Sequence, residues 1–143
     1  MLELSIDVRN VRFGRRLKQA AQKAAQTAVL LERDDGVYEA ALLVTDDETL
    51  KHLNRVYREA DKATDVLSFP SGEDVFLGDI GLSLERARAQ AKEYGHPVKR
   101  EVAFLVTHAM LHLLGYTHKG DDDEKRMRSR QREILKEAGY ERP

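Results

Sequence analysis

Three histidines in the last third of the chain have the spacing of a metal site. His108 and His112 are four residues apart, so on a helix their side chains lie one turn apart on the same face. Gly115 follows them, and a glycine here can end the helix in a left-handed conformation, which turns the chain so that His118 comes back toward the pair. The spacing therefore predicts that three imidazole nitrogens bind one divalent ion.

The ligand types indicate which metal and which chemistry to expect. The 143-residue chain has no cysteine, which excludes thiolate ligands, disulfides and thiol nucleophiles. Neutral imidazoles suit Zn²⁺ best, with nickel, cobalt or iron as alternatives. Three protein ligands leave a position for water, whose pKa a bound zinc ion lowers to about 7, so the pattern favours a hydrolase. The acidic run at 121–123 could close the site, but it is more typical of a helix cap and a solvated surface.

The spacing also equals the long zinc-protease pattern H-x-x-x-H-x-x-G-x-x-H, with one difference. That pattern needs a glutamate directly after the first histidine as general base, and this chain has Ala109 there. A methyl group cannot accept a proton, so a metallopeptidase is the weaker interpretation.

The helix that carries the histidines is predicted to be buried and central. We expect it over residues 97–114, with Pro97 in its first turn. Apolar residues lie on all of its sides, as in a helix that is packed on every face. Burying imidazoles in such a helix costs roughly 2–7 kcal/mol each unless they find partners, and one ion would satisfy all three.

The remaining helices and strands are predicted from the spacing of hydrophobic residues and from turn residues. Strands are predicted at 2–8, 37–44, 66–69 and 77–82, and further helices at 15–31, at 46 to about 57, at 84–94 and at 121–138. We expect Thr45, Ser83 and Asp121 to cap the last three of these helices, and a polar loop at 58–63. The order predicts an α+β fold in a single domain, 1–143, with a small mixed sheet of about four strands packed with five helices.

The composition predicts a globular protein and argues against an intrinsically disordered one. Hydrophobic residues make up 41% and charged residues 34%, which is typical of a globular protein. The 24 basic and 25 acidic residues give a net charge of -1, so a polyanion would need a local patch; the run from Arg9 to Lys23, with six basic and no acidic residues, is a candidate. The absence of a signal sequence and of a long apolar stretch predicts a cytoplasmic protein without a membrane partner.

Two long motifs resemble the YbeY family of bacterial single-strand-specific metallo-endoribonucleases. The segment 108–118, HAMLHLLGYTH, is similar to the family's H-G-x-L-H-L-x-G-Y-D-H, and the segment 57–70, YREADKATDVLSFP, to Y-R-x-x-D-K-P-T-D-V-L-S-F-P. The block 77–80 and the tail through Gly139 are also similar, so the likeness covers about two thirds of the chain.

The resemblance implies a zinc-dependent endoribonuclease in ribosomal RNA processing, which acts at the 3′ end of small-subunit RNA and in ribosome quality control. It implies that His108, His112 and His118 bind the ion, with Arg58 and His108 as catalytic residues, and that the partners are single-stranded rRNA and ribosomal particles. A guanidinium such as that of Arg58 can clamp a phosphate and stabilise the charge that grows during cleavage.

The chain departs from the family motifs at three positions. Ala109 replaces glycine and adds a methyl group near the ion, Thr117 replaces an aspartate, and Ala63 replaces proline. None of these changes removes a predicted ligand. Two alternatives stay open: a non-catalytic, metal-stabilised factor that binds RNA or ribosomes, and, more weakly, a metallopeptidase. The oligomeric state is left open by the sequence.

Overall fold

The fold of the chain has the predicted element order. A computed structural model describes residues 1–33, 35–58, 64–117 and 119–141. Its elements are β1 (Leu2–Val8), α1 (Arg15–Glu32), β2 (Tyr38–Thr45), α2 (Asp47–Arg58), β3 (Val66–Pro70), β4 (Phe76–Ser83), α3 (Leu84–Tyr94), α4 (Val98–Leu113) and α5 (Asp121–Ala138). The α+β class, the four-stranded sheet and the five helices are confirmed.

The sheet is mixed, with strand order β1-β2-β4-β3. β1, β2 and β4 are parallel to one another, and β3 runs antiparallel to β4 at one edge. Leu2 and Leu4 of β1 are buried while Glu3 and Ser5 are exposed, so the period-two pattern of the sequence identifies the face that packs on the helices.

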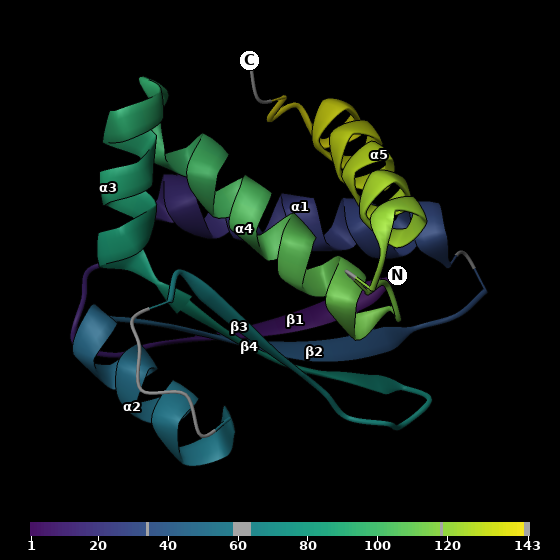
Figure 1. The fold of residues 1–143 in the computed structure, drawn as a ribbon, viewed down its shortest axis with the longest axis horizontal. Coiled ribbons are helices and arrows are strands. Elements are labelled where there is room, and N and C mark those ends of the chain that lie inside the picture. Colours follow the sequence, from purple (N-terminus) through teal and green to yellow (C-terminus); the bar gives the residue numbers. More distant parts are fainter. Residues whose placement is uncertain (34, 59–63, 118, 142–143) are drawn as a thin grey trace.

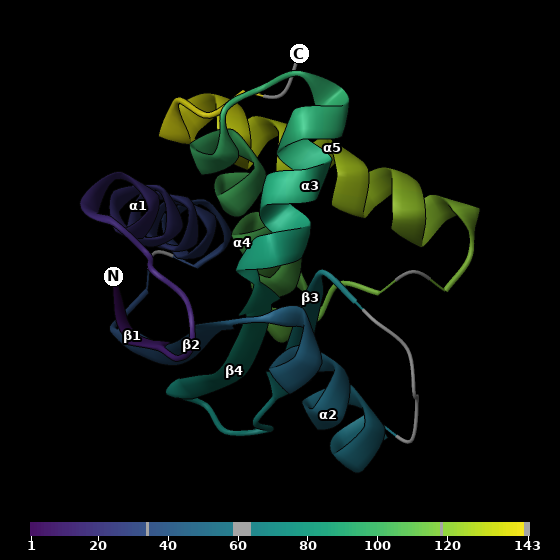
Figure 2. The ribbon, with the colours of Figure 1, turned by 90° about the vertical axis from the view of Figure 1, so that its left-hand side faces the viewer.

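The helices form two unequal layers around the sheet. Figures 1 and 2 show α1, α3, α4 and α5 on one face and α2 alone on the other. α4 lies at the centre of the thicker layer, where it packs against α1, α3, α5 and β3, and most of its side chains are buried. The predicted buried central helix is therefore confirmed. Within the described residues, no helix has both the length and the apolar character needed to cross a bilayer.

Side chains of α1 satisfy backbone groups of the edge strand β1. The side-chain amide of Gln26 accepts a hydrogen bond from Leu2 N at 3.1 Å and donates one to Leu2 O. Gln22 Nε2 donates to Leu4 O at 3.0 Å. These three bonds do for β1 what a further strand does inside a sheet.

Gly78 allows β4, β3 and α4 to approach closely. Its φ is +146°, and a Cβ atom there would lie 2.3 Å from the carbonyl oxygen of Phe69 and 2.9 Å from the side chain of Leu113. A side chain at this position would push β3 away from β4 or α4 away from both.

Two of the three predicted helix caps are wrong. Thr45 ends β2, and its buried hydroxyl donates to Arg9 O at 3.0 Å; Asp46 caps α2 instead, with Oδ1 accepting from Thr49 N at 2.7 Å. The N-cap of α5 is Gly120, with no side-chain cap, rather than Asp121. The third cap is confirmed, since the Ser83 hydroxyl accepts from Arg86 N at 3.2 Å.

Candidate metal centre

His108 and His112 face each other on the last two turns of α4. Their Nε2 atoms are 3.3 Å apart, and their rings meet edge to face with centroids 4.8 Å apart. Both histidines are half-buried, whereas Ala109 between them in the sequence is buried. The spacing of four residues therefore places the two imidazoles together, as predicted.

The turn after α4 fixes the orientation of His112. Gly115 has φ +104°, its N–H donates to His112 O, and the Tyr116 N–H donates to Leu111 O, which is the Schellman pattern of a helix end. This turn brings the carbonyl oxygen of Tyr116 within 3.1 Å of His112 Nδ1. A carbonyl only accepts hydrogen bonds, so Nδ1 carries the proton and Nε2 keeps its lone pair.

The pair fits the edge of a tetrahedral metal site. Two nitrogens that each lie about 2.0–2.1 Å from one zinc ion are roughly 3.3–3.4 Å apart in tetrahedral geometry. The observed Nε2–Nε2 distance of 3.3 Å matches this edge. The hydrogen bond from Nδ1 to a backbone carbonyl is also the partner that metal-bound histidines usually have on their other nitrogen.

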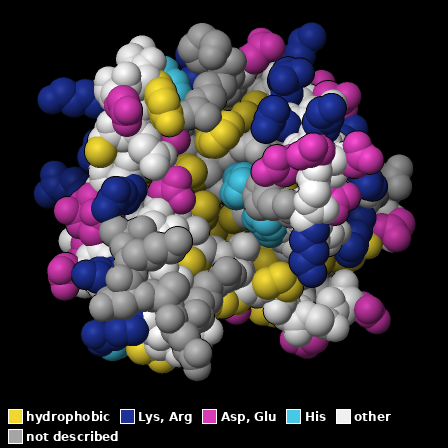
Figure 3. Space-filling model, in the orientation of Figure 1, with side chains coloured by type: hydrophobic (Ala, Val, Ile, Leu, Met, Phe, Trp, Pro, Cys, Tyr) yellow, Lys and Arg dark blue, Asp and Glu magenta, His cyan; other side chains and the backbone are white. Residues whose placement is uncertain are grey.

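A polar pocket of about 340 Å³ opens in front of the two histidines. One wall is the edge strand β3, with Val66, Ser68 and Pro70, and the other is α4 with the turn that follows it. In the space-filling view, histidine side chains lie in a hollow near the centre of this face, beside hydrophobic side chains (Figure 3). Asp65 also lines the pocket, where its carboxylate accepts from Gln90 Nε2 at 3.1 Å. Sequence reasoning singled out neither Asp65 nor Ser68.

A charged network holds the turn that orients His112. The Tyr116 hydroxyl donates to Glu32 Oε2 at 2.9 Å, and Arg130 Nε donates to Glu32 Oε1 at 2.6 Å. Burial, together with the Glu32 carboxylate, raises the pKa of the Tyr116 hydroxyl, which stays a donor. The hydrogen bond to Glu32 likewise raises the pKa of Arg130. No sequence signal identified this network, because its members come from α1, the turn after α4, and α5.

The structure describes the other predicted site residues only in part. His118 lies outside the described residues, and within the described part no third His, Asp or Glu joins a metal-binding group. Arg58 is the last residue of α2, not the first of a loop, and its side chain is outside the described part. In the acidic run, Asp121 and Asp122 are exposed and none of the three lines the histidine pocket, in agreement with a solvated surface.

The basic run from Arg9 to Lys23, which begins before α1 and continues into it, lies apart from the histidine pocket. All six basic side chains from Arg9 to Lys23 are exposed. Arg15, Lys18 and Lys23 border a shallow groove with Tyr140, and this groove shares no lining residue with the histidine pocket. Any RNA contact there would be made away from the candidate centre.

Comparison with known proteins decides the family. The family model described as Endoribonuclease YbeY matches residues 5–139. The chain belongs to the YbeY family. A YbeY endoribonuclease of Roseiflexus sp. is 45% identical over 133 residues, which cover 85% of this chain and 83% of the relative. That of Alkaliphilus metalliredigens is 39% identical over 152 residues, covering 99% of this chain and 98% of the relative.

A solved structure agrees with the fold. The solution structure of TM1509 from Thermotoga maritima superimposes with a TM-score of 0.69 at 26% sequence identity, and the match covers 95% of this chain and 89% of that one. The α+β architecture described above is therefore shared with an experimentally determined structure.

One departure from the YbeY motif has a local compensation. Thr117 stands where the motif has an aspartate, and its hydroxyl donates to Asp123 Oδ2 at 2.9 Å. The first turn of α5 thus supplies a carboxylate next to this position, although through an intervening hydroxyl. Ala109 is buried and lines the histidine pocket, so its methyl group narrows the pocket relative to the glycine of the motif.

Proposed function

We propose that the chain is a zinc-dependent endoribonuclease that cuts single-stranded ribosomal RNA in the cytoplasm. Its role would be in small-subunit 3′-end maturation and in ribosome quality control, on free rRNA or on ribosomal particles, with residues 1–143 as one metal-dependent hydrolase domain. The observation that carries the proposal is the pair of Nε2 atoms 3.3 Å apart, oriented by the turn at Gly115, in a chain whose relatives are endoribonucleases.

In this proposal His108, His112 and His118 hold the ion, and nickel or another divalent metal could replace zinc. A bound ion would lower the pKa of water and polarise the phosphate of the RNA. The chain's own residues then have separate tasks. Tyr116 O keeps the His112 Nε2 lone pair directed into the pocket, because it accepts the Nδ1 proton. Arg58, at the end of α2, would contact the phosphate and stabilise its growing negative charge.

Cleavage of a labelled single-stranded RNA by the purified protein tests the proposal, with the same RNA in a duplex for comparison. We expect the single strand to be cut, chelation to stop cleavage, and added zinc to restore it. His108→Ala should abolish cleavage, and Arg58→Ala should slow it about 100-fold, a typical effect of losing one transition-state contact. His52→Ala is the matched control, because His52 is exposed on α2 and does not line the histidine pocket.

The same experiment separates the alternatives. RNA that is bound but never cut, by a protein that retains its metal, would indicate a non-catalytic assembly factor. Equal cleavage by the His108→Ala variant after full chelation would refute the metal mechanism.

A further inference from the structure

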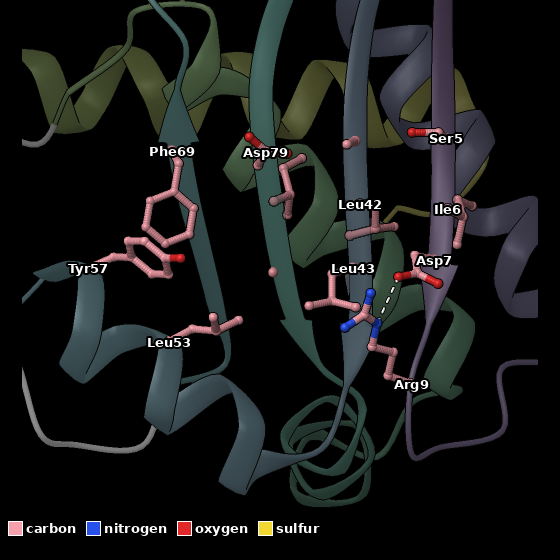
Figure 4. A pocket seen from close by; sticks show the side chains of 13 residues that line it. Ser5, Ile6, Asp7, Arg9, Leu42, Leu43, Leu53, Tyr57, Phe69 and Asp79 are labelled. Carbon is pink, nitrogen blue, oxygen red and sulfur yellow. Dashed lines mark hydrogen bonds and ion pairs between the residues drawn. The ribbon is translucent and has the colours of Figure 1, made fainter.

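A second cavity lies on the opposite face of the sheet. It has a volume of about 610 Å³, within the range of about 300–1,000 Å³ that is common for ligand sites. Figure 4 shows its arrangement: α2 contributes Leu53 and Tyr57, the sheet contributes Leu43, Phe69 and Asp79, and the end of β1 closes it with the ion pair of Asp7 and Arg9. We call this cavity the sheet groove.

The sheet groove presents an aromatic side chain to solvent. The Tyr57 ring meets the Phe69 ring edge to face, at 71° with centroids 6.0 Å apart, so this contact covers only part of the ring. Tyr57 remains 69% exposed, although its neighbours in the groove are apolar. An exposed ring above an apolar floor is the platform on which proteins stack nucleobases.

The charges of the sheet groove suit a base and disfavour a phosphate. Asp7 and Asp79 bring two carboxylates, and the guanidinium of Arg9 is already paired with Asp7 at 3.0 Å. A phosphate would be repelled, whereas a neutral ring would not. Asp79 is exposed and lies opposite Phe69 in the register of β3 and β4, so a ring stacked in the groove would turn its edge toward this carboxylate.

A carboxylate accepts hydrogen bonds and cannot donate them. It therefore recognises the exocyclic amino group of cytosine, as it does in base readout, and equally that of adenine or guanine. Uracil has no amino group, and its one ring donor in RNA, N3–H, lies between two carbonyl oxygens that would repel the carboxylate.

The sheet groove and the candidate centre lie on opposite faces of the same edge strand, β3. Ser68 and Pro70 of β3 line the histidine pocket, while Phe69 between them lines the groove on the other face. Tyr57 directly precedes Arg58 at the end of α2. A strand of RNA crossing the β3 edge could thus place a phosphate before the histidines and a neighbouring base in the groove.

We propose that the sheet groove binds a nucleobase that carries an exocyclic amino group, next to the scissile phosphate of a single-stranded RNA. The inference rests on the proposed function and adds a base preference to it.

Binding of two labelled oligonucleotides, oligo(C) and oligo(U) of equal length, tests the inference by fluorescence anisotropy. The two have the same charge, so the difference in their affinities reports base recognition and cancels most of the backbone contribution. We expect oligo(C) to bind about tenfold more tightly. Tyr57→Ala should weaken binding of both about tenfold through lost stacking, and Asp79→Asn should reduce the preference for oligo(C). Tyr94→Ala removes a tyrosine that is 55% exposed on α3, away from the groove, and should leave both affinities unchanged.

Two outcomes would overturn the inference: no preference between the oligonucleotides, or unchanged affinities in Tyr57→Ala. Either result would instead favour a protein partner as the occupant of the sheet groove. Failure of the proposed function is distinguishable, because the base preference is measured by binding alone. If cleavage depends on His108 but not on Tyr57 or Asp79, only the proposed role of the sheet groove would be refuted. If the protein shows the base preference but cuts no RNA, only the proposed nuclease activity would be refuted.

Discussion

The hydroxyl of Tyr116 and the carboxylate of Glu32 form a hydrogen bond of 2.9 Å between residues 84 positions apart in the sequence. The bond fixes the turn whose carbonyl oxygen orients His112. It thereby connects the C-terminal end of α1 to the candidate centre, although Glu32 does not line the histidine pocket.

Tyr116→Phe should therefore weaken metal binding without removing a ligand. Loss of the hydroxyl loosens the turn and the orientation of His112, and we expect about a tenfold lower zinc affinity in a titration against a competing chelator. Tyr38→Phe is the matched control, because the Tyr38 hydroxyl also donates to a carboxylate, that of Asp35 at 2.6 Å, but outside the pocket. Equal zinc affinities for Tyr116→Phe and the unaltered protein would contradict the positioning role.

Gly78→Ala should destabilise the fold more than a glycine substitution elsewhere. The new methyl group would meet the Phe69 carbonyl oxygen and Leu113. We expect a loss of about 3 kcal/mol or more in the free energy of unfolding by urea. Gly72 also has a positive φ, of +77°, but a methyl group there would meet no neighbour within 4 Å, so Gly72→Ala should cost only about 1 kcal/mol. Similar losses in the two variants would show that backbone strain, and not the close approach, is what requires glycine at position 78.

His96→Ala should also lower stability, for an electrostatic reason. His96 Nε2 lies 2.8 Å from Glu101 Oε1, and both side chains are 1% exposed. Removing the imidazole takes away a partner of a buried carboxylate, which costs about 3 kcal/mol. Chemical denaturation measures this loss, and His52→Ala, at an exposed position, should change stability by less than about 0.5 kcal/mol. A small loss in His96→Ala would mean that water or a rearranged side chain replaces the imidazole.

Asp46 gives the stability of α2 a defined dependence on pH. Hydrogen bonds from the side chain and backbone of Thr49 hold the pKa of Asp46 below 3.8. A carboxyl with a lowered pKa in the folded state stabilises fully above its unfolded pKa, and this contribution is lost as the pH falls through the folded pKa. Asp46→Ala should cost about 1 kcal/mol at neutral pH, as for other N-caps, and the deficit should shrink below pH 3.8. Thermal unfolding at several pH values measures the deficit, and one that is constant with pH would contradict the assignment.

Local signals in the sequence predicted most of the fold. The alternation in β1, the spacing of His108 and His112 and the glycine at 115 each concern residues close in the chain, where geometry depends on few neighbours. One of the two wrong helix caps arose where a distant contact decides the outcome. Thr45 has the composition of a helix cap, but its hydroxyl is used by Arg9 O, which lies 36 residues away.

In the candidate site, too, local features could be predicted and contacts between distant segments could not. Its histidine pair could be predicted because helical periodicity alone brings the rings together. Glu32 and Arg130 could not, since only packing of α1 and α5 beside α4 brings them to Tyr116. The sheet groove combines all four strands of the sheet with α2, so no single segment of sequence contains its pattern.

The amides of Gln22 and Gln26 have a consequence for how molecules of this protein meet one another. An uncovered outer strand is a template on which a second molecule can add its own strand and start an aggregate. Here the outermost carbonyls of Leu2 and Leu4 are already occupied by side chains of the same molecule. Two glutamines thus act against self-association along β1, at a position where many proteins rely on lysine or proline.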